Sequence, residues 1–150
     1  MADVKFDIES LRRRGNHFQT NDFLVEDSLK NRVIGDSCTG YSVKIKCLSY
    51  RSIWVSTIED ITLKVDGVEV PKSNILLCVN NKKFLVSQLT QLFAEYWYAI
   101  EDGEIIVNQI GGLSKGEHEI DITIMRHNDF GYSHEFVAFP NTDCKKFTVS

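Results

Sequence analysis

Three side chains near the C-terminus, His127, Asp129 and His134, are of the types that bind metal ions. Two imidazoles and one carboxylate form a common ligand set for iron, with open positions left for substrate. Here they flank Gly131 in a polar stretch typical of a loop. Their spacing matches no defined metal-binding pattern. A small metal-dependent enzyme is therefore a minor hypothesis, which metal analysis of the isolated chain tests.

Two groups of carboxylates also invite a chemical interpretation, and strand geometry argues against both. His118 stands between Glu117 and Glu119. Neighbouring side chains on a strand point to opposite faces, so these three cannot converge on one metal ion. The same argument separates Glu59 from Asp60, which excludes them as a pair for glycoside hydrolysis. We predict that His118 lies at the solvated start of a strand; if it shares the face of Ile120, Ile122 and Ile124, it is instead a partly buried residue at the rim of that face.

The glycine-rich run 111–116 lacks the spacing and the Gly-Lys-Ser/Thr end of a P-loop, so it is predicted to form a turn or bulge. The cysteines show no CxxC spacing, which argues against zinc. We expect four reduced thiols in a cytoplasmic protein. These residues are Cys38, Cys47, Cys78 and Cys144. No catalytic triad can be identified, and no catalytic or metal-binding residue is assigned to this chain.

The composition excludes several classes of protein. The 150 residues carry 17 basic and 21 acidic side chains, a net charge of −4, which argues against nucleic-acid binding. The chain is 43% hydrophobic, too much for a disordered chain. Its apolar runs are too short to span a bilayer. Charged residues at positions 3–9 argue against a signal peptide. We therefore expect neither a nucleic-acid nor a membrane partner.

The elements that position these residues are predicted to be strands. Apolar residues alternate with polar ones in 41–47, 61–70 and 120–125, which is the period of a half-buried strand. Asp66-Gly67 supplies the backbone of a type I′ hairpin turn. Asn80-Asn81 and Asp102-Gly103 suggest two further hairpins. Closing strands are expected at 136–139 and 147–149.

The spacing of these strands predicts the fold. Short strands at intervals of about 8–12 residues are typical of a sandwich or barrel. We predict an all-β, antiparallel, jelly-roll-like β-sandwich that forms a single domain over residues 1–150, with 1–28 as an N-terminal arm and first strand. At most one or two short helices are expected, one of them over 88–93 and capped by Ser87.

Several sequence segments, taken in order, resemble a known family. They are 40–46, 49–51, 56–59, 64–70, 95–98 and 111–118, which read GYSVKIK, SYR, STIE, KVDGVEV, EYWY and GGLSKGEH. In this order they resemble the small β subunit of bacterial C-glycoside deglycosidases over about residues 30–125. One departure is Ser52, where the family pattern leads us to expect glycine.

The resemblance implies a two-subunit lyase that breaks the carbon–carbon bond of a C-glycoside, typically of a flavonoid. A separate oxidoreductase has already oxidised the sugar to a ketone at its 3-position. The ketone acidifies the neighbouring C–H, and loss of that proton allows elimination of the aglycone. The catalytic base and a divalent metal, manganese as expected, belong to a TIM-barrel α subunit. The β subunit docks beside it as a sandwich and lacks catalytic residues.

The predicted contacts with this partner combine exposed aromatic residues and a glycine turn, because aromatic and Arg side chains are enriched at interface hot spots. The candidates are Tyr50, Arg51, Trp54, Trp97, Gly111 and Gly112. Two alternatives stay open, since each tryptophan could lie in the core and the glycine pair could be only a turn. The alternative function is a carbohydrate-binding module that stacks sugars on these aromatic rings.

Overall fold

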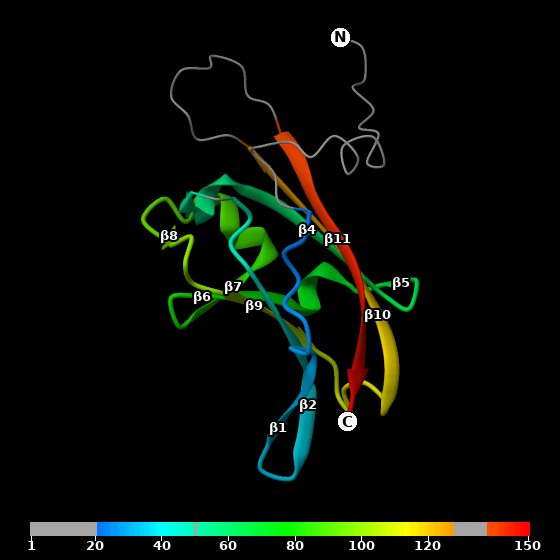
Figure 1. Ribbon diagram of the computed structural model, residues 1–150. Coiled ribbons are helices and arrows are strands. Elements are labelled where there is room, and N and C mark those ends of the chain that lie inside the picture. Colours follow the sequence, from blue (N-terminus) through cyan, green and yellow to red (C-terminus); the bar gives the residue numbers. More distant parts are fainter. Residues whose placement is uncertain (1–20, 50, 128–137) are drawn as a thin grey trace.

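The computed structural model describes residues 21–49, 51–127 and 138–150. Two antiparallel sheets enclose one apolar core, and a two-stranded pair lies beside them (Figure 1). The first sheet has the order β1 (Lys30–Ile34), β2 (Ser37–Ile45), β9 (Gly103–Asn108), β6 (Ile75–Val79), β7 (Lys82–Leu85). The second has the order β11 (Ala138–Val149), β10 (Gly116–His127), β4 (Ile58–Val65), β5 (Val68–Glu69), and the pair is β3 (Ile53–Trp54) with β8 (Tyr96–Trp97).

This arrangement confirms the predicted all-β, antiparallel sandwich. The chain passes between the two large sheets after β2, after β5 and after β9, which gives the jelly-roll-like crossovers. The single-domain prediction over residues 1–150 includes residues 1–20, which lie outside the described part, and it stays a prediction. No helix in the described ranges has the length and apolar character needed to cross a bilayer.

The alternating pattern decides which side chains enter the core. In β10, every second residue from His118 to Arg126 is buried, while those between are partly or fully exposed. Ile120, Ile122 and Ile124 have no exposed surface. Burying a side chain of this size stabilises a fold by roughly 1.5–3 kcal/mol. The sandwich is therefore held mainly by aliphatic layers supplied by facing strands.

Two of the three predicted hairpins are correct. Asp66 and Gly67 have φ of 52° and 82°, and Asn80 and Asn81 have 57° and 61°, as a type I′ turn requires. The third was wrong. Strand β8 pairs with β3, whereas β9 pairs with β2 and β6, so Asp102-Gly103 does not join two paired strands.

The predicted short helix near residue 90 is present as a 3₁₀ helix with different bounds. The described residues contain three short 3₁₀ helices, η1 (Val55–Thr57), η2 (Lys72–Asn74) and η3 (Val86–Gln91). Helix η3 begins two residues before the predicted segment 88–93, and Ser87 does not cap it. Instead the Gln88 side chain accepts a hydrogen bond from the Leu85 amide at 2.9 Å. The predicted closing strand at 147–149 belongs to β11, while 136 and 137 lie outside the described residues.

A buried carboxylate joins the N-terminal segment to β11. Asp143 is 6% exposed, and its Oδ2 accepts hydrogen bonds from the amides of Phe23 and Leu24 at 3.0 and 2.9 Å. Leu24 also forms a β-bridge with Ile45 of β2. Segment 21–25 thus spans from one large sheet to the other. Part of the predicted N-terminal arm is therefore an ordered side wall of the sandwich.

Candidate functional site

The pair β3–β8 carries two tryptophans with opposite environments. In its ladder Ile53 lies opposite Trp97, and Trp54 lies opposite Tyr96. Ile53 and Trp97 are buried, at 3% and 0% exposure, while Trp54 is 42% exposed and Tyr98 is 51% exposed. One face of the pair therefore packs on the core, and the other presents aromatic rings to solvent.

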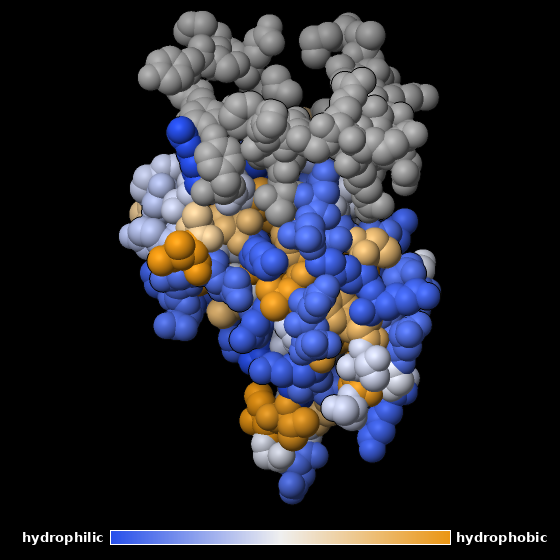
Figure 2. Space-filling model, viewed as in Figure 1, coloured by the Kyte–Doolittle hydropathy of each residue, from blue (hydrophilic) through white to orange (hydrophobic). Residues whose placement is uncertain are grey.

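We call Trp54, Tyr96 and Tyr98 the aromatic surface. The ring centroids of Trp54 and Tyr96 lie 4.6 Å apart at a tilt of 58°. Those of Tyr96 and Tyr98 lie 5.2 Å apart with the rings nearly perpendicular, at 89°. Such tilted and edge-to-face contacts stabilise aromatic pairs and fix their orientation. Other exposed apolar side chains form separate patches on a largely hydrophilic surface (Figure 2).

Hydrogen bonds hold the backbone beneath the aromatic surface. The Val55 amide donates to the Glu95 carbonyl at 2.9 Å, and the Asn80 side chain donates to the Tyr96 carbonyl at 2.8 Å. The Glu95 carboxylate accepts from Lys82 and Asn80, and these contacts lower its pKa. Because the strands are fixed on several sides, the rings are presented with little loss of freedom on binding.

Ser52, which departs from the family pattern, belongs to this support. Its hydroxyl accepts a hydrogen bond from the Ala99 amide at 2.9 Å, between the segments that precede β3 and follow β8. Glycine could not make this contact. The departure therefore adds a polar link to the local turn.

The predicted contact residues do not all lie on this surface. Trp54 does, and Arg51 is exposed close to it in sequence. Trp97 was wrongly predicted to face a partner, because its indole is enclosed by the core and its Nε1 donates to the Glu101 carbonyl at 2.7 Å. Tyr50 lies outside the described residues. Tyr96 was missed. The alternation of Tyr96, Trp97 and Tyr98 already places the two tyrosines on one face of the strand and Trp97 on the other.

Gly111 and Gly112 form a turn next to the start of β2. Both have positive φ, 89° and 63°. The Gly111 amide donates to the Cys38 carbonyl at 3.0 Å. A Cβ on Gly112 would lie 2.3 Å from Asn31 Oδ1, whereas one on Gly111 would meet nothing within 4 Å. A side chain at Gly112 would thus displace the Asn31 or Cys38 side chain, and the role of both glycines at an interface stays a prediction.

Replacing Gly112 with alanine should destabilise the fold more than the same change at Gly111. Both residues have positive φ, so each variant carries backbone strain of about 1–2 kcal/mol. Only Gly112→Ala also displaces Asn31, whose side chain makes two 2.8 Å hydrogen bonds with the Leu113 backbone. We expect an extra loss of about 1–3 kcal/mol in urea unfolding. Equal losses in the two variants would contradict this account.

Other candidate chemical groups are not assembled into a catalytic site among the described residues. No group of three or more His, Cys, Asp or Glu in that part of the chain is placed to hold a metal ion. His127 Nδ1 lies 3.3 Å from a Glu59 oxygen. Asp129 and His134, the remaining members of the metal hypothesis, lie outside the described residues.

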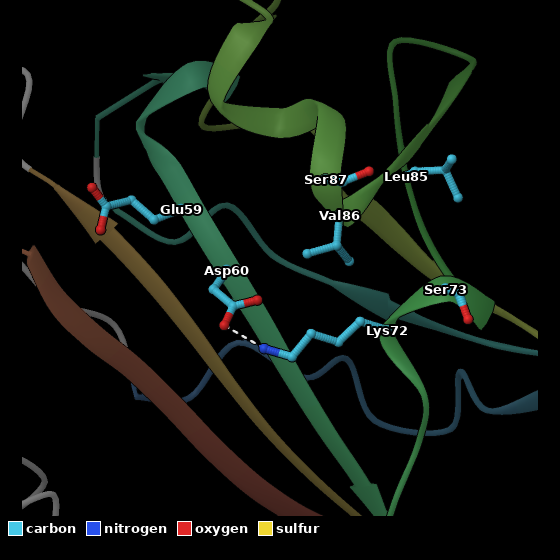
Figure 3. Close-up of a pocket in the computed structure, with 7 residues that line it drawn as sticks. All are labelled: Glu59, Asp60, Lys72, Ser73, Leu85, Val86 and Ser87. Atoms are coloured by element: carbon cyan, nitrogen blue, oxygen red, sulfur yellow. Dashed lines mark hydrogen bonds and ion pairs between the residues drawn. The ribbon is translucent and has the colours of Figure 1, made fainter.

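Glu59 and Asp60 both line a hollow of about 410 Å³ between β4, η2 and η3 (Figure 3). The strand is not regular at this point, because the β4–β10 register shifts: Ile58 pairs with Arg126 and Asp60 with Met125. This bulge inserts Glu59 as an extra residue. Figure 3 shows the two carboxylates pointing apart, with Asp60 ion-paired to Lys72. They do not form a catalytic pair.

The described residues therefore define a class: a small antiparallel β-sandwich with a rigid, exposed aromatic surface, as expected of a domain that binds another molecule. The family comparison is more specific. Residues 19–130, about three quarters of the chain, match the family described as the C-glycoside deglycosidase beta subunit. The chain belongs to that family, which confirms the resemblance found in the sequence.

Three curated proteins illustrate the relationship. The chain is 29% identical over 82 residues to the C-glycoside deglycosidase beta subunit of Eubacterium cellulosolvens, covering 55% of this chain and 56% of that protein. It is 20% identical over 86 residues to the subunit of the same name in Arthrobacter globiformis, covering 57% and 64%. The chain thus aligns with less than two thirds of the length of each of these two relatives.

A third relative aligns over more of its length. The chain is 24% identical over 127 residues to a 3′-dehydrocarminate deglycosidase beta subunit of a Microbacterium species, covering 84% of this chain and 92% of that protein. The names of all three relatives describe beta subunits.

Proposed function

We propose that this chain is the beta subunit of a heteromeric lyase that cleaves the C-glycosidic bond of 3-oxo-C-glycosides. The family match over residues 19–130 carries the proposal. The name of the Microbacterium relative, which describes a 3′-dehydro substrate, supports a sugar already oxidised to a ketone. A flavonoid C-glucoside is the proposed type of substrate.

In the proposed reaction the ketone makes the C–H at the neighbouring sugar carbon acidic. A base removes that proton, a double bond forms toward the anomeric carbon, and the bond from that carbon to the aglycone breaks. The aglycone carbon then takes up a proton. A TIM-barrel alpha subunit would supply the base and a divalent metal, manganese as expected, to stabilise the enolate.

This chain's proposed role is auxiliary. It would dock its aromatic surface on the alpha subunit, order the loops there and exclude water from the reacting sugar. Trp54 and the two tyrosines suit this role because aromatic side chains commonly dominate binding at interfaces. All four cysteines are free thiols, which supports the proposed cytoplasmic location.

A carbohydrate-binding module is less well supported. A sugar ring binds best to a flat aromatic platform, and the rings of the aromatic surface are tilted or perpendicular to one another. Their faces are partly used in contacts among themselves. Calorimetry with the isolated chain tests this alternative, which requires sugar binding that is lost in Trp54→Ala.

Co-expression with the candidate alpha subunit tests the main proposal. We expect the two chains to co-purify, and we expect cleavage of a 3-oxo-C-glycoside to fall at least about tenfold when this chain is omitted, which corresponds to about 1.4 kcal/mol. Adding the purified chain back should restore activity. If the alpha subunit is fully active alone and the chains do not associate, the proposal fails.

A further inference from the structure

His118 lies near the start of β10 and makes two short hydrogen bonds. The start of β10 and strand β8 lie toward opposite ends of the sandwich (Figure 1). Its Nδ1 lies 2.7 Å from Asp66 Oδ2, and its Nε2 lies 2.7 Å from the Ser114 carbonyl oxygen. The residue is only 8% exposed. The Ser114 hydroxyl lies further from Nε2, at 3.4 Å, so the nearest group to each ring nitrogen is an oxygen acceptor of the protein.

These two partners define the protonation state of the ring. An ionised carboxylate and a backbone carbonyl can only accept hydrogen bonds. A neutral imidazole carries one N–H and could donate to only one of them, leaving two lone pairs facing each other at the second contact. Both contacts are satisfied together only by the doubly protonated imidazolium.

The contacts join three segments of the chain. Asp66 begins the β4–β5 turn, and its Oδ1 accepts a hydrogen bond from the Glu119 amide at 2.8 Å. Ser114 belongs to the loop 109–115, which connects β9 to β10. Besides these, the loop's described side-chain hydrogen bonds are those between Asn31 and Leu113 and from Gln109 to the Gly112 carbonyl. Leu113 also packs against the core, and the amides of Gln109 and Gly111 donate to carbonyls of β2, so His118 is the contact that holds the 114–115 end of the loop.

We propose that His118 acts as a proton-dependent pin, which in its imidazolium form fastens loop 109–115 to the β4–β5 turn and releases it on deprotonation. The pin is a conformational switch in the fold and does not depend on the proposed function. Because the loop includes Gly111 and Gly112, the switch would control the order of that candidate contact region.

The charges around the ring support this behaviour. Asp66 raises the pKa of His118, the Ser114 carbonyl adds to this, and burial opposes both. The pKa of Asp66 is lowered by its hydrogen bonds from Glu119 and His118. Across β11 the neighbour is Phe147, which carries no charge, and Lys145 further along is engaged by Asp22.

The remaining ionisable neighbours do not compete for the ring. Glu117 and Glu119 flank His118 in sequence but are exposed on the other face of β10. Lys115 is exposed in the loop. Tyr41 stays neutral, because burial and Asp66 raise its pKa to about 12.

The sign of the pH dependence follows from these directions. Since folding raises the pKa of His118, the pin contributes fully below the ordinary histidine pKa of about 6.5 and is lost as pH rises through the folded value. Since folding lowers the pKa of Asp66, the stability that its carboxylate contributes is lost only as pH falls through its folded pKa. Both groups are charged, and the pin is intact, between the folded pKa of Asp66 and the folded pKa of His118.

Nuclear magnetic resonance on the full chain tests the pin. Side-chain ¹⁵N shifts should show both His118 nitrogens protonated at pH 6 and a pKa above the ordinary histidine value of about 6.5, which Asp66→Asn should lower. Amide exchange at residues 112–115, corrected for its intrinsic pH dependence, should rise about tenfold as His118 loses its proton. The Asn80-Asn81 turn is the internal control.

Two results would overturn the proposal. One is a His118 ring with a single N–H at pH 6, and this measurement on the unaltered chain decides even if Asp66→Asn does not fold. The other is loop exchange that is unchanged across the titration of His118. The Glu59→Gln variant provides the matched control, because the contact of Glu59 with His127 lies at the other end of β10 and its loss should leave the loop unaffected.

Discussion

Replacing Trp97 with alanine should lower the free energy of unfolding by about 3–5 kcal/mol, which is the usual cost of deleting a buried large aromatic side chain. The indole has no exposed surface. A Cβ on Gly103 would lie 2.8 Å from its ring, so the backbone there is already in close contact with the indole. The chain cannot collapse easily into the space that alanine leaves.

Urea unfolding followed by circular dichroism measures this loss. Domains of this size are commonly stable by only about 5–15 kcal/mol, so Trp97→Ala should shift the midpoint strongly or prevent folding. Trp97→Phe keeps much of the volume but leaves the Glu101 carbonyl without its 2.7 Å donor, and we expect an intermediate loss. A loss below about 1 kcal/mol for Trp97→Ala would show that the indole is not a core element.

The contrast between Trp97 and Trp54 shows where sequence reasoning stops. Both tryptophans lie among polar neighbours, so composition alone left each as a possible contact residue. Their separation depends on the pairing of β3 with β8, two short strands more than forty residues apart. Local alternation places Trp97 on one face of the strand and Tyr96 and Tyr98 on the other, but it does not tell which face meets the core.

Turns followed the same division between local and distant causes. The backbone of Asp66-Gly67 and Asn80-Asn81 is set by the residues themselves, and both formed hairpins as predicted. Asp102-Gly103 has similar chemistry, yet Gly103 begins a strand that pairs with β2 and β6. Long-range pairing overrode a local preference there.

The region of Glu59 and Asp60 gives a third case. Period-two reasoning holds only while a strand is regular, and the bulge opposite Met125 and Arg126 breaks it. A bulge depends on how two strands register over their whole length, which no short sequence pattern specifies. The conclusion that this pair is not catalytic still holds, since the two carboxylates point apart and contact Lys72 and His127 separately (Figure 3).

Removing Trp54 and Tyr98 together should abolish tight association with the alpha subunit while leaving the fold intact. The two side chains are 42% and 51% exposed, so their loss should cost much less stability than Trp97→Ala, about 1–2 kcal/mol each from the partly buried rings and their contacts with Tyr96. Aromatic residues that act as interface hot spots contribute about 2 kcal/mol or more apiece. We therefore expect the double variant Trp54→Ala/Tyr98→Ala to bind at least about 100-fold more weakly.

The matched control removes two exposed apolar side chains from the far end of the sandwich. Val33 and Ile34, at the tip of the β1–β2 hairpin, are 62% and 68% exposed. Calorimetric titration of the alpha subunit with Val33→Ala/Ile34→Ala should give the unaltered affinity. If this control weakens binding and the aromatic variant does not, the partner docks at the hairpin end, and the aromatic surface must have another role.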